Sequence, residues 1–228
     1  MIIGSDFDGT IFIDGKISKK DIKAIKDFQE AGNLFAIITG RSLVSLNPLI
    51  KGKIEPDAII GNNGGHIYIR EDSSYKEVFK ARIEKEKAKE FLNFYKKHIT
   101  NDMVIFTDNK RLENLSDVDE DIIALAIYRD DKITNYFPED FDFHYSIGVI
   151  DVVKKGINKQ RGIEFLKDYY SYNKDIIAIG DDYNDIDFLK ETPLSYTLDY
   201  VTNDKVRKAA NFTVESVASL IEELMGEI

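Results

Sequence analysis

Residues 1–10 have the sequence MIIGSDFDGT, in which a short apolar run passes directly into a polar loop that holds two aspartates. An apolar run of this length without alternation is typical of a strand that is buried on both faces of a sheet. Asp6 and Asp8 lie two residues apart, and side chains at that spacing share a side in an extended segment. The stretch therefore predicts a buried strand whose following loop can present two carboxylates together.

The same pattern recurs further along the chain. Ser18, followed by Asp21, predicts the start of a helix. The apolar run at residues 34–38 comes next and ends at Thr-Gly-Arg, and the run at 176–179 ends at the loop GDDYND of residues 180–185. Fully apolar strands that alternate with helices predict a parallel sheet covered on both faces. The predicted fold class is therefore α/β, with a Rossmann-like core.

The middle of the chain has a different pattern. A charged helix is predicted over residues 84–98, and strand-like segments over 103–107, 122–128 and 144–153 are joined by turn-rich connections. These features indicate a small separate α/β unit of antiparallel strands. The predicted organisation is a discontinuous core, residues 1–79 and 152–228, with a cap domain, residues 80–151, inserted between its two parts.

The net charge and the lack of cysteine limit which ligands and which kinds of site we expect. The 228 residues carry a formal net charge of −10, and the acidic residues are spread along the chain. Such a field repels nucleic acids and anionic membranes, so we expect neither as a partner. It also repels phosphorylated small molecules, so any phosphate site must be built locally from a cation and basic groups. The chain has no cysteine, which excludes disulfides, thiolate catalysis and cysteine zinc sites.

The sequence shows neither the pattern of a cleavable leader nor that of a membrane helix. The first candidate motif begins at Asp6, which leaves no room before it for a cleavable leader. No apolar run approaches the ~20 residues that a membrane helix needs. We therefore expect a cytoplasmic protein. The sequence makes no prediction of its oligomeric state.

The polar loops at the strand ends predict one ligand crevice. In a parallel α/β sheet, ligands bind beyond the carboxyl ends of the strands, where these loops would meet. So many carboxylates cannot all remain ionised without a cation. Oxygen ligands without nearby cysteine or histidine suit Mg²⁺. The carboxylates that would share the crevice are those of Asp6, Asp8, Asp181, Asp182 and Asp185.

The crevice also has the parts needed for phosphoryl transfer. Thr39 offers a hydroxyl, and Arg41 and Lys159 offer positive charge for a phosphoryl group. One of the paired carboxylates, Asp6 or Asp8, can attack phosphorus to form an acyl phosphate. The other can protonate the leaving oxygen and then deprotonate water.

Four motifs, in this order, resemble those of the haloacid dehalogenase superfamily of phosphatases. DFDGT at 6–10 looks like the first motif, and TGR at 39–41 matches the second in the form typical of the Cof-like subfamily. KGINKQRG at 155–162 resembles the third motif, and GDDYND at 180–185 the fourth. NGG at 63–65 resembles the Asn-Gly-Ala stretch before the family's lid. The resemblance covers nearly the whole chain, and an insert between the second and third motifs resembles a type IIB cap.

The resemblance implies roles for individual residues. It implies Asp6 as the nucleophile and Asp8 as the general acid and base, with Thr39 and Lys159 holding the phosphate and Asn184 orienting Lys159 or a water. It also implies Mg²⁺ held by the Asp6 side chain, the Asp8 backbone carbonyl and Asp181, with Asp185 as a ligand or a supporting group. The predicted catalytic residues are thus Asp6, Asp8 and Lys159, the phosphate-binding residues Thr39, Gly40, Arg41 and Asn184, and the metal ligands Asp6, Asp8, Asp181 and Asp185.

The expected activity is magnesium-dependent hydrolysis of a small phosphomonoester, such as a sugar phosphate, through an aspartyl-phosphate. A sugar phosphomutase with the same pair of aspartates and a non-catalytic phosphate-binding protein stay open as alternatives. The segment 194–200, LSYTLDY, departs from the Gly-Val-Ala-Met-x-Asn-Ala stretch of the Cof-like proteins. This departure predicts a differently shaped loop beside the site.

Overall fold

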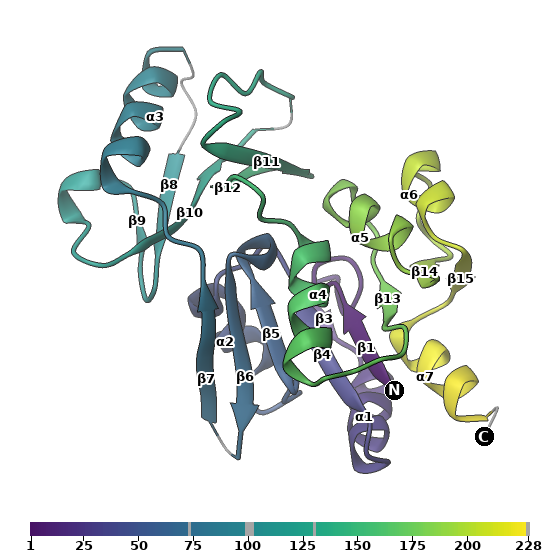
Figure 1. The fold of residues 1–228 in the computed structure, drawn as a ribbon. Coiled ribbons are helices and arrows are strands. Elements are labelled where there is room, and N and C mark those ends of the chain that lie inside the picture. Colours follow the sequence, from purple (N-terminus) through teal and green to yellow (C-terminus); the bar gives the residue numbers. More distant parts are fainter. Residues whose placement is uncertain (73, 99–102, 130, 227–228) are drawn as a thin grey trace.

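The computed structural model describes residues 1–72, 74–98, 103–129 and 131–226. Its core is an eight-stranded sheet in the order β15-β14-β13-β1-β4-β5-β6-β7 (Figure 1). Six neighbouring strands are parallel, and the hairpin of β6 and β7 adds two antiparallel strands at one edge. The strands are β1 (Ile2–Ser5), β4 (Leu34–Ile38), β5 (Ala58–Gly61), β6 (His66–Glu71), β7 (Ser74–Lys80), β13 (Ile177–Ile179), β14 (Leu194–Leu198) and β15 (Phe212–Val214).

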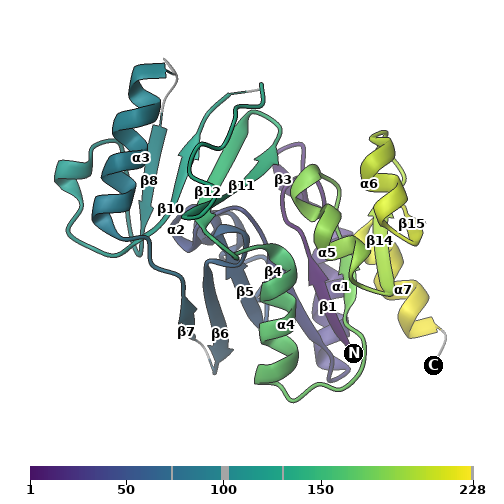
Figure 2. The same ribbon diagram turned by 45° about the horizontal axis from the view of Figure 1, so that its top comes forward.

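Helices cover both faces of this sheet (Figures 1 and 2). On one face α1 packs beside α7, and a backbone N–H of α7, that of Ala218, donates to Asp21 of α1. On the other face α4 crosses the central strands, where Ile163 lies against Gly4 of β1. The helices of the core are α1 (Lys19–Glu30), α2 (Leu43–Ile50), α4 (Lys159–Tyr169), α5 (Ile186–Lys190), α6 (Asp204–Ala209) and α7 (Val217–Gly226).

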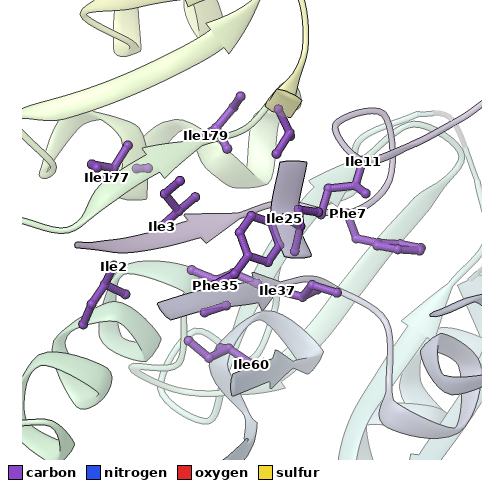
Figure 3. Packing of buried hydrophobic residues seen from close by; sticks show 14 of the residues in the cluster. Ile2, Ile3, Phe7, Ile11, Ile25, Phe35, Ile37, Ile60, Ile177 and Ile179 are labelled. Carbon is purple, nitrogen blue, oxygen red and sulfur yellow. The ribbon is translucent and has the colours of Figure 1, made fainter. Parts of the chain in front are cut away.

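The central strands are buried because their side chains are apolar on both faces. Ile3 and Phe35 are fully buried, and they belong to the neighbouring strands β1 and β4. Figure 3 shows their packing with Ile177 and Ile179 of β13. A strand enclosed in this way cannot slip by one residue without burying its polar neighbours, so the register of β1 fixes where Asp6 emerges.

The predicted helix start at Ser18 is confirmed. The Ser18 hydroxyl accepts a hydrogen bond from the Asp21 N–H at 3.0 Å, which caps α1. The helix ends before Gly32, whose φ of 81° belongs to the left-handed region that glycine adopts readily.

The cap is a five-stranded antiparallel sheet in the order β11-β12-β10-β8-β9, and α3 packs against it over a core of its own (Figure 1). Phe91 of α3 is fully buried in that core and contacts the rings of Tyr95 and Phe141. The elements are α3 (Lys85–His98), β8 (Met103–Thr107), β9 (Arg111–Leu112), β10 (Ile122–Ile127), β11 (Phe141–Ser146) and β12 (Val149–Lys154).

One prediction about the cap needs correction. The segment 144–153 was expected as a strand-like run, but it belongs to a hairpin of β11 and β12 that turns at Ile147 and Gly148, where Gly148 has a φ of 76°. The strand β12 of the cap sheet spans the boundary expected at residue 151 and ends at Lys154. The division into two domains stays a prediction. Among the described residues, none of the helices has the length and apolar content that a membrane crossing requires.

Candidate active site

The candidate site lies where β1, β4 and β13 end. These three strands are neighbours and parallel, so the loops that follow them emerge at the same edge of the sheet. Asp6 follows β1 directly, and its N–H donates to the carbonyl of Ile179 in β13 at 2.8 Å. The loops after β1, β4 and β13 therefore meet, as the sequence predicted.

Lys159 is the buried cation of the site. It is the first residue of α4, which Asn158 caps by accepting the N–H of Arg161, and it is 1% exposed. Its ammonium nitrogen lies 2.5 Å from Oδ1 of Asp6 and 2.6 Å from Oδ1 of Asp185. Burial alone would lower the pKa of Lys159, but the two carboxylates outweigh it and raise that pKa. Lys159 therefore stays positively charged between two aspartates.

Asp6 and Asp181 are carboxylates in a site with an excess of negative charge. Burial raises the pKa of Asp6 well above its usual range, opposed by Lys159 and reinforced by Asp185 and Asp181. Burial and the neighbouring Asp185 raise the pKa of Asp181 to about 6. Carboxylate oxygens of Asp6, Asp181 and Asp185 all lie within 4.8 Å of one another. One lysine does not balance these charges, which is the electrostatic condition that a bound divalent cation relieves.

Asp185 mainly orders the loop around it. Its Oδ1 accepts from Lys159, and its Oδ2 accepts the backbone N–H groups of Asp181 and Asp182, both at 2.9 Å. Both oxygens are thus engaged by the protein itself. Asp182 caps the short 3₁₀ turn η3 (Tyr183–Asp185), so the loop after β13 is held in one shape.

Asp8 is paired with Arg41. The guanidinium donates through Nε to Oδ2 of Asp8 at 2.6 Å and through Nη2 to Oδ1 at 2.7 Å. The same guanidinium lies 5.9 Å from the ring centroid of Phe7 and 6.0 Å from that of Phe12. Hydrogen bonding to Asp8 raises the pKa of Arg41. A planar guanidinium suits this bidentate and stacked position better than an ammonium.

The remaining predicted phosphate-binding residues line the same space. Thr39 is buried, and its hydroxyl accepts the Arg41 N–H at 3.1 Å. Gly40 has no room for a side chain, because an added Cβ would lie 2.4 Å from Oδ2 of Asp151. Asn184 donates to Oδ1 of Asn63 at 3.2 Å, whereas the hydrogen bonds of the Lys159 ammonium go to the two aspartates in the described part of the chain. Asn184 thus contacts Asn63, and its expected role of orienting Lys159 or a water stays a prediction.

These groups surround a cavity of about 490 Å³ between core and cap. The core lines it with Asp6, Asp8, Gly9, Thr39, Gly40, Arg41, Ser42, Ser45, Asp181, Asp182 and Asn184, and the cap with Phe106, Tyr128, Ser146, Ile147, Val149 and Asp151.

The sequence matches the family profile of the haloacid dehalogenase-like hydrolases over two overlapping segments, residues 3–142 and 113–219. The chain belongs to this family of hydrolases. Among curated relatives, a 5-amino-6-(5-phospho-D-ribitylamino)uracil phosphatase of Bacillus subtilis is 25% identical, with 94% of this chain and 90% of the relative covered.

Solved structures share the fold. A HAD/COF-like hydrolase of Plasmodium vivax superposes with a TM-score of 0.84 at 20% identity, covering 100% of this chain and 96% of the other. A sugar phosphatase of HAD subclass IIB superposes with a TM-score of 0.76 at 18% identity, covering 100% and 99%. The haloacid dehalogenase fold that the resemblance implied is thus confirmed over the full chain.

Two residues of the site escaped the sequence reasoning. Tyr200 donates its hydroxyl to the carbonyl of Gly9 and, at 3.1 Å, to Oδ2 of Asp181, whose other oxygen accepts from Thr10 at 2.6 Å. Tyr200 lies in the segment that departs from the Cof-like pattern, and that departure was the available signal. Asp151 lines the cavity from β12. Its signal was a lone charge in the apolar run Ile-Asp-Val-Val of residues 150–153.

Proposed function

We propose that this hydrolase is a magnesium-dependent phosphatase that cleaves small phosphomonoesters through an aspartyl-phosphate on Asp6. The observation that carries the proposal is the position of Asp6. Its carboxylate lies at the carboxyl end of a central parallel strand, is held by a buried lysine, and lines a cavity together with Asp8. A fixed carboxylate beside a second one is the arrangement that covalent phosphoryl transfer needs.

In the first half of the reaction, a carboxylate oxygen of Asp6 attacks phosphorus and the bond between phosphorus and the ester oxygen breaks. Asp8 gives its proton to the departing oxygen. In the second half, Asp8 removes a proton from water, the water oxygen attacks phosphorus, and the bond from phosphorus to Asp6 breaks. Inorganic phosphate leaves, and both aspartates return to their starting states. Since Arg41 occupies both Asp8 oxygens, this pair must open for Asp8 to reach the substrate.

The donors of the site suit Mg²⁺. Asp6 and Asp181 offer carboxylate oxygens, and burial together with neighbouring carboxylates raises the pKa of both groups, an effect that a bound cation would oppose. Asp8 can offer its backbone carbonyl, because its side chain is engaged by Arg41. Asp185 would position Lys159 and the loop of Asp181 and would not bind the cation itself, since its oxygens already accept from Lys159 and two N–H groups. When bound, Mg²⁺ would neutralise charge on the transferring phosphoryl group.

The phosphate itself would be held by groups of the core. Lys159 is close enough to Asp6 to contact an oxygen of a phosphoryl group bound there. Thr39 and Gly40 would border the same oxygens, Arg41 would supply a second positive charge, and Asn184 would close the opposite side. The cap would enclose the organic part of the ester. The relatives in Bacillus subtilis are named for a phosphorylated ribitylaminouracil, and we include that compound with sugar phosphates as a candidate substrate.

The test is release of inorganic phosphate from 4-nitrophenyl phosphate, with and without Mg²⁺, by the wild type and Asp6→Asn. Asp14→Asn is the matched control, because Asp14 is exposed in a turn with a φ of 51°, which asparagine also adopts. The proposal predicts magnesium-dependent release by wild type and control and none by Asp6→Asn. Equal release by Asp6→Asn would remove Asp6 from the reaction. Transfer of phosphate between sugar positions without its release would instead identify a phosphomutase.

A further inference from the structure

Within the described part of the chain, the cap contributes one charged side chain to the wall of the cavity. That side chain is Asp151, in the middle of β12, where it pairs with Ala126 and His144 of the neighbouring strands. The other cap residues of the wall are uncharged: Phe106, Tyr128, Ser146, Ile147 and Val149. The described residues of the cap therefore present to a ligand an uncharged, partly apolar surface and a single carboxylate.

Asp151 reaches from the cap to the loop that would hold the phosphate. Its Oδ2 accepts a hydrogen bond from Nδ2 of Asn63 at 2.8 Å and lies 2.4 Å from the position that a Cβ on Gly40 would take. Asn63 is fully buried and is itself held by Asn184. Within the described residues, the hydrogen bond from Asn63 goes to Oδ2, so Oδ1 is the oxygen that a ligand in the cavity can reach. Because Oδ2 lies at Gly40 and Gly40 adjoins Thr39, the Asp151 carboxylate lies next to the expected phosphate position.

Positive charge for a second anion is scarce around the cavity. Within the described chain, Arg41 is the cation that lines it, and Arg41 is already bound to Asp8. Nearby cations outside the lining also have partners. Arg129 is paired with Asp131, and Arg111 lies against the ring of Tyr128 and 3.8 Å from Glu113. Lys132 lies over the rings of Tyr145 and Tyr183. A ligand that places a carboxylate or a second phosphate in the cavity would thus put this anion opposite Asp151, with no free cation among the described residues around the cavity to pair with it.

We propose that Asp151 determines which leaving group the enzyme accepts: its carboxylate accepts a hydrogen bond from a hydroxyl or amine close to the phosphate, and it excludes leaving groups that carry negative charge there. This inference rests on the proposed phosphatase function. The matching leaving group is neutral or cationic. A like charge placed against a fixed carboxylate costs enough to reject a partner, whereas a hydrogen-bond donor meets an acceptor already in place.

The uncharged wall indicates what the rest of the leaving group is like. Ile147 at the turn between β11 and β12 is 88% exposed, and Tyr128 is 38% exposed, and both line the cavity. Apolar side chains exposed at a cavity are typical of ligand contact. A ring or carbon chain would pack here while its donor group faces Asp151.

Three esters with the same ring test this selection: phenyl phosphate, 3-carboxyphenyl phosphate and 3-(aminomethyl)phenyl phosphate. We would measure kcat/KM from phosphate release in Mg²⁺ at pH 7.5 for the wild type, Asp151→Asn and Asp117→Asn. Asparagine keeps the size of the side chain and an oxygen for Asn63. Asp117 is an exposed carboxylate elsewhere in the cap, so its variant controls for a general loss of charge. Melting temperatures verify that each variant is folded.

The expected wild-type kcat/KM is at least about tenfold higher for the neutral and cationic esters than for the carboxylated one, mainly through KM. In Asp151→Asn this ratio falls by about fivefold or more, and in Asp117→Asn it equals that of the wild type. An unchanged ratio in folded Asp151→Asn overturns the inference and leaves Asp151 as a structural partner of Asn63.

A failure of the phosphatase function would look different, since no ester would then release phosphate. Titration calorimetry of the three esters on Asp6→Asn and on Asp6→Asn with Asp151→Asn then measures the same discrimination as binding. Weaker binding of the carboxylated ester that depends on Asp151 supports the inference. Equal binding of all three esters overturns it.

Discussion

The ammonium group of Lys159 lies between the carboxylates of Asp6 and Asp185, 2.5 Å from the first and 2.6 Å from the second, and all three side chains are buried. Asp181 adds a third carboxylate to the same cluster. One positive charge thus serves three potential negative charges inside the protein. Burial is the main cause of the raised pKa of Asp6 and of Asp181, and the neighbouring carboxylates add to it. The lysine, the proposed nucleophile and the expected cation are thereby coupled electrostatically.

Replacing Lys159 with methionine should lower both activity and stability. The side chain keeps its length, but Asp6 and Asp185 lose their buried counter-charge, which typically costs about 3–5 kcal/mol in the free energy of unfolding. We expect kcat/KM for 4-nitrophenyl phosphate to fall by about 10²–10³-fold, because one donor to the transferring group is lost. Phosphate release and urea unfolding measure the two effects. Lys190→Met, at an exposed position of α5, is the control, and activity equal to wild type in Lys159→Met would contradict the assigned role.

The effect of magnesium should depend on pH in a defined direction. The pKa of Asp181 is raised to about 6 by burial and by Asp185, so this group holds a proton at pH 5 and has lost it at pH 7.5. Because the folded protein holds this proton more tightly than the unfolded chain, protonation of Asp181 stabilises the fold. That stabilisation is complete below the unfolded pKa of about 3.9 and is lost as the pH rises through 6. Magnesium must displace that proton at low pH, so it should raise the melting temperature more at pH 7.5 than at pH 5.

Thermal melts with and without Mg²⁺ at both pH values test this prediction. In Asp181→Asn the increment from magnesium should be small at either pH, because a ligand that must be ionised has been removed. An increment in the wild type that is the same at pH 5 and pH 7.5 would show that Asp181 does not bind the cation.

Tyr200→Phe should weaken the binding of magnesium without unfolding the protein. The hydroxyl of Tyr200 donates to Asp181 and to the Gly9 carbonyl, so its loss removes one of the two side-chain hydroxyls that hold this predicted metal ligand and leaves Thr10 as the other. Loss of such an outer partner typically costs 10–100-fold in metal affinity. We expect the magnesium concentration for half-maximal activity to rise by about tenfold or more. The matched control is Tyr169→Phe, an exposed tyrosine on α4. If the two variants have the same magnesium requirement, Tyr200 does not position Asp181.

Arg41→Lys should show that the shape of this cation matters as well as its charge. Lysine lacks the planar fork that reaches Asp8 through Nε and Nη2, and its ammonium cannot stack on Phe7 as a planar guanidinium does. We expect kcat/KM to fall by about tenfold or more, with an unchanged magnesium requirement. Arg161→Lys is the control, since Arg161 lies over the ring of Phe79 instead. Full activity in Arg41→Lys would mean that its charge alone is needed.

The sequence predicted the core well because local and tertiary preferences agree there. Residues 34–38 are apolar throughout and form β4 with those bounds, since a strand buried on both faces needs no alternation. The motif residues Asp6, Thr39 and Asp181 were correctly placed together, because parallel strands end at one edge of the sheet.

What the sequence missed depends on contacts between distant segments. The turn at Ile147 and Gly148 was not predicted, because the residues on both sides of it are strand-like and the segment resembles one continuous strand. Asp151 reaches the site only because the cap strand passes above Gly40. Tyr200 meets Asp181 across a loop whose path no local pattern specifies. These contacts come from tertiary packing, which the pattern of apolar and polar residues along the chain does not predict.

The most direct test of the account is to trap the phosphoryl group on Asp6. Asp8→Asn would be mixed with an aryl phosphate and Mg²⁺, quenched, and treated with borohydride, which reduces an aspartyl-phosphate to homoserine. Asparagine at position 8 cannot deprotonate water, so the intermediate should accumulate. Peptide mass spectrometry should then find homoserine at position 6 only when substrate and Mg²⁺ were both present. Phosphate release by Asp8→Asn with no homoserine, or homoserine at another aspartate, would contradict a mechanism through Asp6.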